Sequence, residues 1–315
     1  MNPALVIRNP AAGRGRASRV WPRVAAALRD SGLAFDESAS RAPLEAMTLA
    51  ARALGRYDKV IAVGGDGTVH EVVNGLMRGA AESPEVTFGV VPLGSGDDFA
   101  KMLPPAVPVG GKAPGWEEAV RRIARGRTQR FDVGRLTGDG LREGLGAGPH
   151  YFANGMDVGF GAVGARNAAS IRWPLTGLAT YLAALAKTMI DYPVLSLRLQ
   201  LDDGEPFEQP STMTAVMNGR CFGSGFWVCP EARPDDGMLD LMITERVSRL
   251  TILRLVPKIL RGAHGGDPAL RLMRARRVVI ESPEPLVVEA DGELPFEAAH
   301  RIEVEVLPRR LAVIA

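Results

Sequence analysis

The strongest constraint on the fold is an alternation of strand and helix signals in the first third of the chain. Short apolar runs at residues 4–10, 33–38, 58–63 and 86–94 are each followed by a turn and then, in most cases, by a stretch with helical spacing of apolar residues. This order predicts a parallel sheet that is wound by helices on both faces, as in Rossmann-like α/β domains. Because ligands of such sheets gather at the carboxyl ends of the strands, the turns after the strands are the first places to look for a site.

Three helices are expected between these strands. The stretch 17–32 has helical spacing, with Ser18 as a candidate N-cap and Gly32 as a stop, and a second helix opens at Pro43. The third covers residues 68–79. Its apolar face consists of Val69, Val72, Val73, Leu76 and Met77.

After the arginine-rich tract 121–130 the pattern changes to short segments, several of them alternating apolar and polar residues, separated by Gly, Pro and Asp turns. This pattern predicts an antiparallel β-sandwich, with helices inserted near residues 161–190 and 248–262.

The change of pattern divides the chain into two domains. We expect an α/β nucleotide-binding domain over residues 1–128 and a β-sandwich domain over residues 129–304. Residues 305–315 could return to complete the first domain.

The charge balance and the cysteines exclude some classes of protein. The chain of 315 residues has 38 basic and 36 acidic residues, a formal net charge of +2, so no polybasic surface of the kind that binds nucleic acid is expected. Cys221 and Cys229 are too few for a disulfide framework, and we expect ordinary buried side chains in an intracellular protein.

Neither a signal peptide nor a membrane span is expected. Arg8 and Pro10 interrupt the first apolar run where a signal peptide needs a continuous apolar core. The longest apolar tract, residues 173–195, contains Lys187 and Asp191 and is too short for a transmembrane helix.

The sequence VGGDGTVHE lies where a strand passes into a helix. Gly64, Gly65 and Gly67 leave backbone amides uncovered and permit the positive φ angles of an anion-binding turn, so they predict a phosphate site. Asp66 would repel phosphates unless a Mg²⁺ ion or a hydroxyl group to be deprotonated lies between them. The alternative is an ordinary turn in which Asp66 caps the helix.

Two other turns fall at neighbouring strand ends, RNPAAGRGRA at residues 8–17 and PLGSGDDFAKML at residues 92–103. In a parallel sheet these three turns rise at one edge and can converge on one ligand, which favours a nucleotide site. None matches the Walker pattern, because no Gly-Lys-Ser/Thr follows the glycines. The notable residues of the two turns are Asn9, Gly13, Arg14, Gly15, Arg16, Gly94, Ser95, Gly96, Asp97 and Asp98.

The motifs NPAAGRG, GGDGTVHEVVNGL, VVPLGSGDDFAKML, DDGMLDL and DGE, in this order and spacing, resemble the diacylglycerol kinase catalytic domain family, specifically the bacterial soluble lipid kinases related to sphingosine and ceramide kinases. The resemblance covers nearly the whole chain. The GGDGT string is shared with NAD kinases and more loosely with phosphofructokinases. Its long form, together with the late DDGMLDL, points to the lipid branch.

The resemblance implies that Gly65 to Glu71 hold ATP phosphates, with Asp66 near the transferred phosphoryl group through metal and water. The family's GTxNDF loop has the form GSGDDF here, so Ser95 stands where a threonine is usual and Asp97 replaces an asparagine. The expected nucleotide-binding residues are Asn9, Ser40, Gly64, Gly65, Asp66, Gly67, Thr68, Val69, His70, Glu71, Gly94, Ser95 and Asp98.

Three basic residues, Lys101, Arg14 and Arg16, are candidates to neutralise phosphate charge. His70 and His150 are expected to be structural rather than catalytic.

In the second domain, residues 229–243 contain an acid pair before a glycine, which is a common turn by itself. The resemblance implies that this loop binds Mg²⁺ through the carboxylate of Asp236 and the backbone carbonyls of Arg233 and Met238, and oxygen ligands suit this hard cation. The ion would be structural and would orient the network that reaches Asp66.

The last motif, EADGELPF, places Asp291 and Glu293 on either side of Gly292. We expect the two acids to alternate on a strand and face the same side; the alternative is a β-turn with solvated acids. By resemblance, Glu293 is the base that takes the proton of a lipid hydroxyl as it attacks the γ-phosphate, with Asp291 in support and Asp66 completing the catalytic set.

Together these features predict an ATP- and Mg²⁺-dependent kinase that phosphorylates a hydroxyl group of a membrane lipid such as diacylglycerol, in a cleft between the two domains. Two alternatives stay open: an NAD or other small-metabolite kinase with the same GGDGT loop, and a catalytically silent lipid- or nucleotide-binding protein, for which the departure at Asp97 is the reason.

The expected partners are the lipid substrate and the bilayer that contains it. We expect a cytoplasmic protein at the inner face of the membrane, and pairing of exposed edge strands could make a homodimer. The basic, amphipathic stretch 251–265 is either a packed helix with a solvated side or a membrane contact.

Overall fold

The computed structural model describes residues 3–80, 86–146, 148–170, 178–190 and 194–315. The chain forms two compact units, residues 1–132 with 309–315 and residues 133–308. Each unit is described by itself below.

The first unit contains a regular alternation of strands and helices. Its elements are β1 (Ala4–Arg8), α1 (Ala12–Asp30), β2 (Phe35–Ala39), α2 (Glu45–Ala53), β3 (Lys59–Gly64), α3 (Asp66–Gly79), β4 (Thr87–Pro92), α4 (Asp98–Lys101) and α5 (Trp116–Arg125). All four strands lie where the apolar runs predicted them.

The remaining elements are mostly strands. They are β5 (Thr128–Gly138), β6 (His150–Phe152), β7 (Gly155–Gly159), α6 (Phe160–Ser170), α7 (Leu178–Thr188), β8 (Leu195–Leu201), β9 (Phe207–Met217), β10 (Leu239–Glu245), α8 (Arg249–Leu260), β11 (Leu270–Ala275), β12 (Arg277–Ala290) and β13 (Glu293–Ile314). Strands β5 and β13 each contribute residues to both units.

The sheet of the first unit is parallel and has the order β2-β1-β3-β4, with the end of β13 beside β4. The connection from β1 runs to one side and the next connection returns to the other side, so the order reverses between β1 and β3. In doubly wound sheets this reversal opens a crevice at the carboxyl ends of the strands, where ligands bind. The predicted Rossmann-like domain is confirmed.

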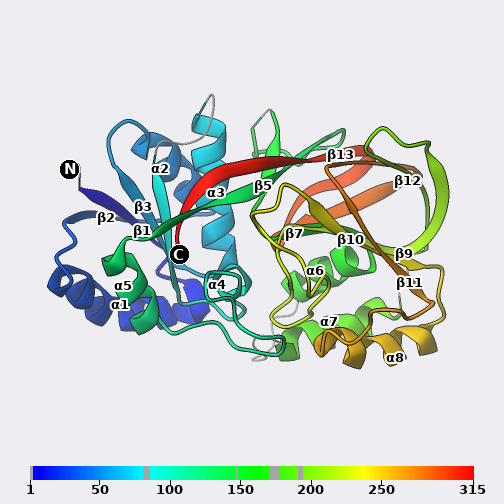
Figure 1. Ribbon diagram of the computed structural model, residues 1–315, viewed down its shortest axis with the longest axis horizontal. Coiled ribbons are helices and arrows are strands. Elements are labelled where there is room, and N and C mark those ends of the chain that lie inside the picture. The colour runs from blue at the N-terminus through cyan, green and yellow to red at the C-terminus, as the bar shows by residue number, and fades with distance from the viewer. Residues whose placement is uncertain (1–2, 81–85, 147, 171–177, 191–193) are drawn as a thin grey trace. The chain divides into compact units, whose positions relative to one another are not determined.

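Helices cover this sheet on both faces (Figure 1). On one face, Trp21, Val24 and Leu28 of α1 and Ile123 of α5 pack on strand residues that include Ile61. On the other, α2 and α3 pack against each other, and every residue of the predicted apolar face of α3 is buried. The prediction of the buried side of α3 from the 3.6-residue period of its apolar residues is therefore confirmed.

The predicted starts of two helices differ from those observed. The first helix begins before the predicted N-cap Ser18, with Gly13, Arg14 and Gly15 in left-handed conformations near its start. Its predicted end is confirmed, because Asp30 is the last helical residue, Ser31 is the C-cap and Gly32 follows with φ of 83°. Pro43 is not the first residue of α2, because Leu44 with φ of 65° occupies the N-cap. Local propensity does not fix such ends, because turn geometry shifts them by a residue or two.

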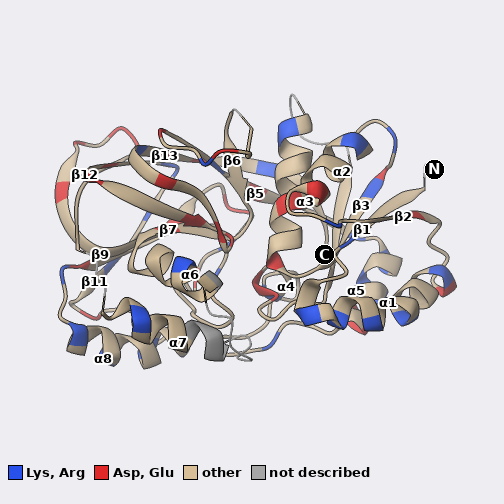
Figure 2. Cartoon of the chain, turned by 180° about the vertical axis from the view of Figure 1, so that it is seen from behind, with Lys and Arg blue, Asp and Glu red and all other residues tan. Residues whose placement is uncertain are grey.

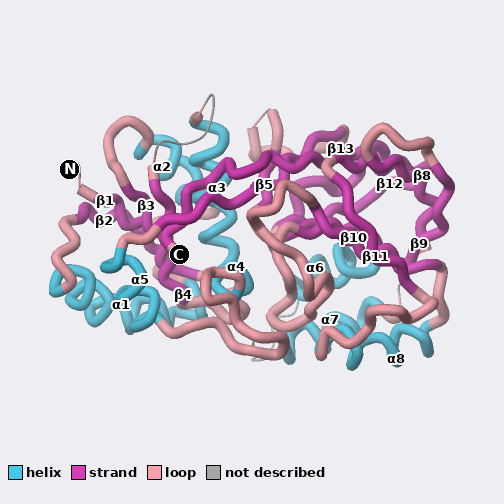
Figure 3. The backbone as a smooth tube through the Cα atoms, viewed as in Figure 1, coloured by secondary structure: helices cyan, strands magenta, loops and turns pink. Residues whose placement is uncertain are grey.

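The second unit is antiparallel and built mainly of strands (Figure 3). Strands β9 and β12 each pair with β7 along one part of their length and with β8 along another, which folds the strands around a single apolar core. The predicted β-sandwich is confirmed. The helices α6, α7 and α8 fall in the expected intervals, while residues 171–177 and 191–193 of the first interval lie outside the described residues.

Two strands of this unit were not predicted correctly. Strand β11 was not expected, because exposed residues outnumber buried ones and leave little alternation to detect. The pattern predicted only short segments, but residues 277–290 form the single long strand β12, whose pairing shifts register past Glu281.

The end of the chain returns to the first unit. Ala312 and Val313 pair in parallel with Thr87 and Phe88 of β4. Residues 309–315 thereby add a last strand to the parallel sheet. The sequence alone had not decided whether the end of the chain completes the first domain.

A glycine in α3 makes close packing of α2 and α3 possible. A Cβ atom at Gly75 would lie 2.1 Å from the carbonyl oxygen of Met47 and 2.8 Å from Cβ of Ala50. We expect Gly75→Ala to lower the free energy of unfolding by about 1–3 kcal/mol, because overpacking outweighs the better helix propensity of alanine.

Thermal unfolding of the variant checks this prediction. Gly164→Ala in α6 is the control, because the nearest atom to its Cβ would be 3.9 Å away. A Gly75→Ala protein that melts at or above the wild-type temperature would contradict the packing described here.

Candidate active site

Three loops meet at the carboxyl end of the parallel sheet. The Cβ of an alanine at position 94 would lie 2.5 Å from Cα of Gly65, and one at Gly13 would lie 2.4 Å from the carbonyl oxygen of Leu93. The loops after β1, β3 and β4 therefore touch through their backbones, and only glycines permit contacts this close. The predicted convergence of the three turns is observed.

Asn9 and Ser40 stand beside these loops. The backbone N–H of Asn9 donates to the carbonyl of Val63 at 2.9 Å, and its side-chain Oδ1 accepts from the N–H of Ala11 at 3.0 Å. The N–H of Ser40 donates to the carbonyl of Arg8 at 2.8 Å. Asn9 thus follows β1, which flanks the switch point, and Ser40 follows the next strand, β2. Their contact with a nucleotide remains a prediction.

Asp66 is the first residue of α3, and its carboxylate does not cap that helix. Its Oδ1 accepts a hydrogen bond of 3.1 Å from the backbone N–H of Phe99 in α4. Burial raises the pKa of Asp66 well above its ordinary value, and the charges of Asp98 and Asp97 raise it further, while Phe99 and Lys101 lower it. The third loop therefore holds Asp66 and also crowds it with negative charge.

Asp97, the departure from the family pattern, makes a contact that an asparagine would also make. Its Oδ1 accepts a hydrogen bond of 2.9 Å from the backbone N–H of Gly94. Burial raises the pKa of Asp97 to about 6, although the Gly94 hydrogen bond and the charge of Arg16 lower it. The fold of the loop thus tolerates the acid, and what changes is the charge.

Asp98 and Lys101 form a buried ion pair within α4. The Nζ atom of Lys101 lies 2.5 Å from Oδ1 of Asp98, and both side chains are 6% exposed. This cation, predicted as a neutraliser of phosphate, already compensates one of the three acids in the loop. Arg14 and Arg16, the other two candidates, are exposed on the loop after β1.

The residues after the glycines point in different directions. Val69 and His70 are buried in the first unit. Glu71 accepts hydrogen bonds of 3.0 Å from the backbone N–H groups of Leu44 and Ala46, which ties the start of α2 to α3. The predicted contacts of these three residues with nucleotide remain predictions, whereas their structural contacts are clear.

Thr68 offers a polar atom without a partner. Its Oγ1 is buried and, among the described residues, has no hydrogen-bond partner. The hydroxyl lies against the first glycine of the loop, because a Cβ at Gly64 would fall 2.3 Å from it. None of Gly64, Gly65 and Gly67 has a positive φ angle, so that part of the predicted turn geometry is wrong. The buried hydroxyl at the start of α3 still suits a phosphorylated ligand.

In the second unit, Asp291 and Gly292 form the two-residue turn between β12 and β13. Ala290 pairs with Glu293 across the turn, and the turn residues have φ angles of 51° and 92°. Positive φ at both positions is the type I′ geometry for which Asp-Gly is a preferred sequence. The expectation that Asp291 and Glu293 alternate on one strand is therefore wrong, and the alternative of a β-turn is correct.

The two acids of this turn have different surroundings. The carboxylate of Asp291 accepts hydrogen bonds from the backbone N–H groups of Ala153 and Asn154 at 2.9 Å and of Gly155 at 3.0 Å. Glu293 is exposed. Asp291 therefore fixes the turn against the loop before β7, and Glu293 is the acid that can reach a ligand.

Two buried acids behind this turn escaped prediction. Asp157 of β7 and Glu289 of β12 lie opposite each other as a cross-strand pair. The exposed fractions of the two residues are 0% and 4%. Glu289 accepts a hydrogen bond from the N–H of Gly292, and Asp157 Oδ1 accepts from the N–H of Ala162 at 2.5 Å. A glutamate that directly follows the apolar run 286–288 and precedes Ala290 is the sequence signal that could have found Glu289.

Because they are buried and lie opposite each other, these two carboxyl groups are expected to share one proton. Burial raises the pKa of Asp157 to about 7, and burial together with the charge of Asp157 raises the pKa of Glu289 well above its ordinary value. Among the described residues Asp157 Oδ2 has no hydrogen-bond partner, and a proton on Glu289 would supply one. Two buried carboxylates cannot both be charged at this separation without a large cost.

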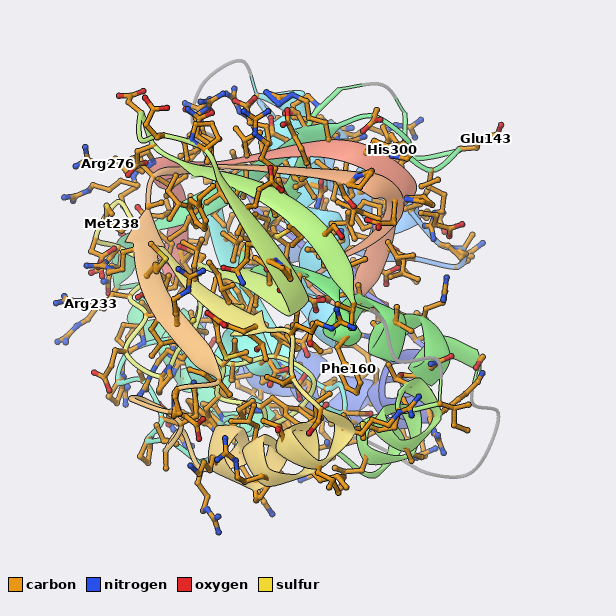
Figure 4. All side chains as sticks on the ribbon, turned by 90° about the vertical axis from the view of Figure 1, so that its right-hand side faces the viewer. Glu143, Phe160, Arg233, Met238, Arg276 and His300 are labelled. Atoms are coloured by element: carbon orange, nitrogen blue, oxygen red, sulfur yellow. The ribbon has the colours of Figure 1, made fainter. Side chains whose placement is uncertain are left out.

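The predicted metal loop lies before β10, and Figure 4 shows Arg233 and Met238 together at one edge of the second unit. Asp236 Oδ1 accepts from the N–H of Met238 at 3.1 Å, and its Oδ2 pairs with Arg274. Asp240 has a buried Oδ2 without a hydrogen-bond partner among the described residues.

The charges of this loop fit a cation. Burial raises the pKa of Asp240 to about 6, Arg274 lowers it, and the charges of Asp236 and Glu231 raise it. An added cation would relieve this repulsion and could use Asp240 Oδ2 as well as the predicted oxygens. In the described part of the chain, no three His, Cys, Asp or Glu side chains form a metal-binding group, so a site here would need backbone carbonyls.

The comparisons with known proteins give the class first. Residues 3–136 match the profile of the diacylglycerol kinase catalytic domain, and residues 154–315 match that of the YegS C-terminal NAD kinase beta sandwich-like domain. Both profiles belong to kinases. The architecture and the three loops at the switch point thus define a two-domain kinase.

Individual relatives give the family. A diacylglycerol kinase of Mycobacterium tuberculosis is 30% identical over 309 residues, which cover 98% of this chain and 93% of the relative. A diacylglycerol kinase of Bacillus subtilis is 28% identical, with 93% and 90% of the two chains covered. The crystal structure of a diacylglycerol kinase from Bacillus anthracis has the same fold, with a TM-score of 0.69 at 19% identity and 99% and 96% coverage. The chain belongs to the diacylglycerol kinase family of lipid kinases.

The shared proton of Asp157 and Glu289 predicts how stability depends on pH. Because both pKa values are raised by folding, the native protein binds protons that the unfolded chain has released, so the free energy of unfolding falls as pH rises from about 4 to about 7 and beyond. We expect Glu289→Gln to weaken this dependence, because the amide can donate to Asp157 and accept from Gly292 without titrating.

Thermal melts between pH 5 and pH 8.5 or so measure this effect. Glu297→Gln, an exposed change on β13, is the matched control and should keep the wild-type slope. If the melting temperature of Glu289→Gln fell with pH as steeply as that of the wild type, the two groups would not share a proton.

Proposed function

We propose that this kinase transfers the γ-phosphate of ATP to the hydroxyl group of a membrane lipid such as diacylglycerol. The observation that carries the proposal is the backbone contact of the loops after β3 and β4, which sets Asp66 among glycine amides at the switch point of the sheet. Membership of a lipid kinase family supports the class of substrate. The relatives named as diacylglycerol kinases support diacylglycerol as the first lipid to test.

The loops of the first unit would bind the nucleotide. Glycines at positions 64, 65 and 94 let the loops pack against each other, so that their backbone amides could bind phosphate oxygens, and Thr68 and Ser95 would provide hydroxyl groups. Asn9 and Ser40 would border the same site. Positioning and charge neutralisation supply most of the rate enhancement in phosphoryl transfer. The close contact of the loops after β3 and β4 would therefore favour catalysis by holding the phosphates in place.

Glu293 would act as the base. Its side chain is exposed, and the turn that carries it is fixed by the three hydrogen bonds that Asp291 accepts. A lipid hydroxyl is too weak an acid to lose its proton unaided at neutral pH, so a positioned carboxylate assists the attack on phosphorus. Asp291 is thus a positioning residue rather than a second base.

We propose two binding sites for Mg²⁺. With ATP it neutralises phosphate charge, which Asp66 would otherwise repel. The loop of the second unit would hold a second ion through the carboxylate of Asp236 and the carbonyls of Arg233 and Met238, with Asp240 as a further acceptor.

Transfer of labelled phosphate from ATP tests the proposal. We expect the purified protein with Mg²⁺ to label a lipid in a total lipid extract and diacylglycerol among the pure lipids tried, with thin-layer separation of the products. Labelling of NAD alone would replace the lipid kinase by a small-metabolite kinase. Binding of ATP without transfer to any acceptor would indicate a silent binding protein.

Substitutions of Asp66 and Glu293 should separate activity from stability. Asp66→Asn keeps an oxygen for the N–H of Phe99 and removes a crowded charge, so the melting temperature should stay equal or rise while kcat falls about 10²-fold or more. Glu293→Gln should lower kcat similarly with an unchanged melting temperature. Glu297→Gln serves as the exposed control; a variant at either site with near-normal kcat would remove that residue from the mechanism.

Asp97→Asn tests the departure from the family pattern. The amide oxygen can accept from Gly94 as the carboxylate does, and one negative charge beside the phosphates is removed. We expect a several-fold lower KM for ATP with an unchanged fold. A higher KM would show that the acid contributes a contact that the asparagine cannot make.

Mg²⁺ binding by the second unit can be measured without activity. Addition of Mg²⁺ should raise the melting temperature, because a ligand that binds only the native state stabilises it. Asp236→Asn should reduce the increase, whereas Asp203→Asn on an exposed turn should not. An equal increase in both variants would place the ion elsewhere.

A further inference from the structure

One face of α8 is apolar and uncovered. Leu250 and Leu253 are 78% and 55% exposed, and Pro257, one turn further along the same side, is exposed as well. The opposite side of the helix holds it in place, because Ile252 and Leu255 are buried. The exposed leucines therefore do not contribute to the core of the second unit. One exposed leucine alone would be ordinary, whereas several apolar residues on one side of the helix form a surface that needs an explanation.

The apolar face extends to the end of α7. The guanidinium group of Arg249 donates to the carbonyl oxygens of Met189 at 2.7 Å and Ile190 at 3.3 Å, which joins the start of α8 to the residues after α7. Ile190 is 76% exposed. Figure 1 shows the two helices next to each other in the second unit. Leu250, Leu253, Pro257 and Ile190 thus form one apolar surface, named here the α8 surface.

The border of the α8 surface is basic. Neither α7 nor α8 contains an acidic residue, and Figure 2 shows only basic colour on α8. Arg254 and Lys258 both reach Asp267, at 2.8 and 2.7 Å, so one carboxylate compensates two cations. Arg249 and Arg261 are exposed beside them. The border therefore keeps a net positive charge.

We propose that the α8 surface docks on an anionic lipid bilayer, with Leu250, Leu253 and Ile190 entering the interface and the basic residues contacting phosphate groups. This inference rests on the proposed function, because a kinase of membrane lipids must reach its substrate at a bilayer. An apolar strip whose border has more cations than acids is the composition of helices that lie in the plane of a membrane surface. In the described residues no helix is both long and apolar enough to cross a membrane, so the contact is one of surface binding.

Binding to vesicles tests the proposal without any need for activity. The probes are vesicles of phosphatidylcholine alone and of phosphatidylcholine with about 30% phosphatidylglycerol, mixed with the full chain and separated by flotation. We expect the wild type to bind the anionic vesicles. The double variant Leu250→Ser, Leu253→Ser should bind them about tenfold or more weakly, because both anchoring side chains are lost.

Two further variants give the controls. Leu272→Ser changes a leucine that is 47% exposed on β11, outside the α8 surface, and should bind as the wild type does. Arg261→Ala should weaken binding to the anionic vesicles several-fold and leave the weak binding to neutral vesicles unchanged. Melting temperatures and transfer of phosphate to a dispersed short-chain diacylglycerol report whether each variant is folded and active.

The possible results separate this inference from the proposed function. Equal vesicle binding by the wild type and the double leucine variant would overturn the inference. A wild type that phosphorylates dispersed diacylglycerol but binds neither kind of vesicle would overturn the docking surface and leave the kinase function in place. Concentration-dependent dimers that the leucine substitutions abolish, with no vesicle binding, would assign the α8 surface to a second copy of this chain instead.

Discussion

The contact between Gly65 and Gly94 is the constraint on which the first unit's site depends. A single added carbon at position 94 would meet the backbone of Gly65, so the loops after β3 and β4 can touch only where both residues are glycine. This contact brings Asp97 and Asp98 close to Asp66 at the start of α3. Burial and the charges of Asp98 and Asp97 raise the pKa of Asp66, and burial and the charge of Asp98 raise the pKa of Asp97. Lys101 is in direct contact with Asp98, one of the three acids. A cluster of three buried or half-buried acids lowers stability and is typical of functional sites. Its location at the switch point of the sheet agrees with such a role.

The second unit arranges its acids differently, with a different effect. Asp291 accepts hydrogen bonds from three backbone N–H groups and fixes the turn, while burial raises the pKa of both Glu289 and Asp157 in the strands behind it. Glu293, directly after the turn, is exposed. In the DGE motif, Asp291 therefore fixes the turn, Gly292 completes it, and Glu293 follows as the proposed base. If Glu293 has that role, changes at Asp291 or Glu289 should affect kcat through the position of Glu293.

Sequence reasoning succeeded where a pattern has one physical cause. The parallel strands and the buried face of α3 followed from apolar runs and from a 3.6-residue period, and the meeting of three loops followed from the rule that ligands gather at one edge of a parallel sheet. It failed where tertiary contacts decide. The alternation of Asp291 and Glu293 was misjudged because Asp291 belongs to a two-residue turn and Glu293 to the strand after it. The short strand β11 has too little apolar alternation to detect. Asp157 and Glu289 could not be paired in advance, because strand register is invisible in one sequence.

Binding of a non-hydrolysable ATP analogue, measured by calorimetry with Mg²⁺ and with a chelator, tests the central claim most directly. Three carboxylates at the loop junction repel bare phosphates, so the account predicts tight binding with Mg²⁺ and binding weaker by about tenfold or more without it. In Asp66→Asn the difference between the two conditions should shrink. Equal affinity with and without Mg²⁺ in the wild type would contradict the claim that these acids and the nucleotide share one site.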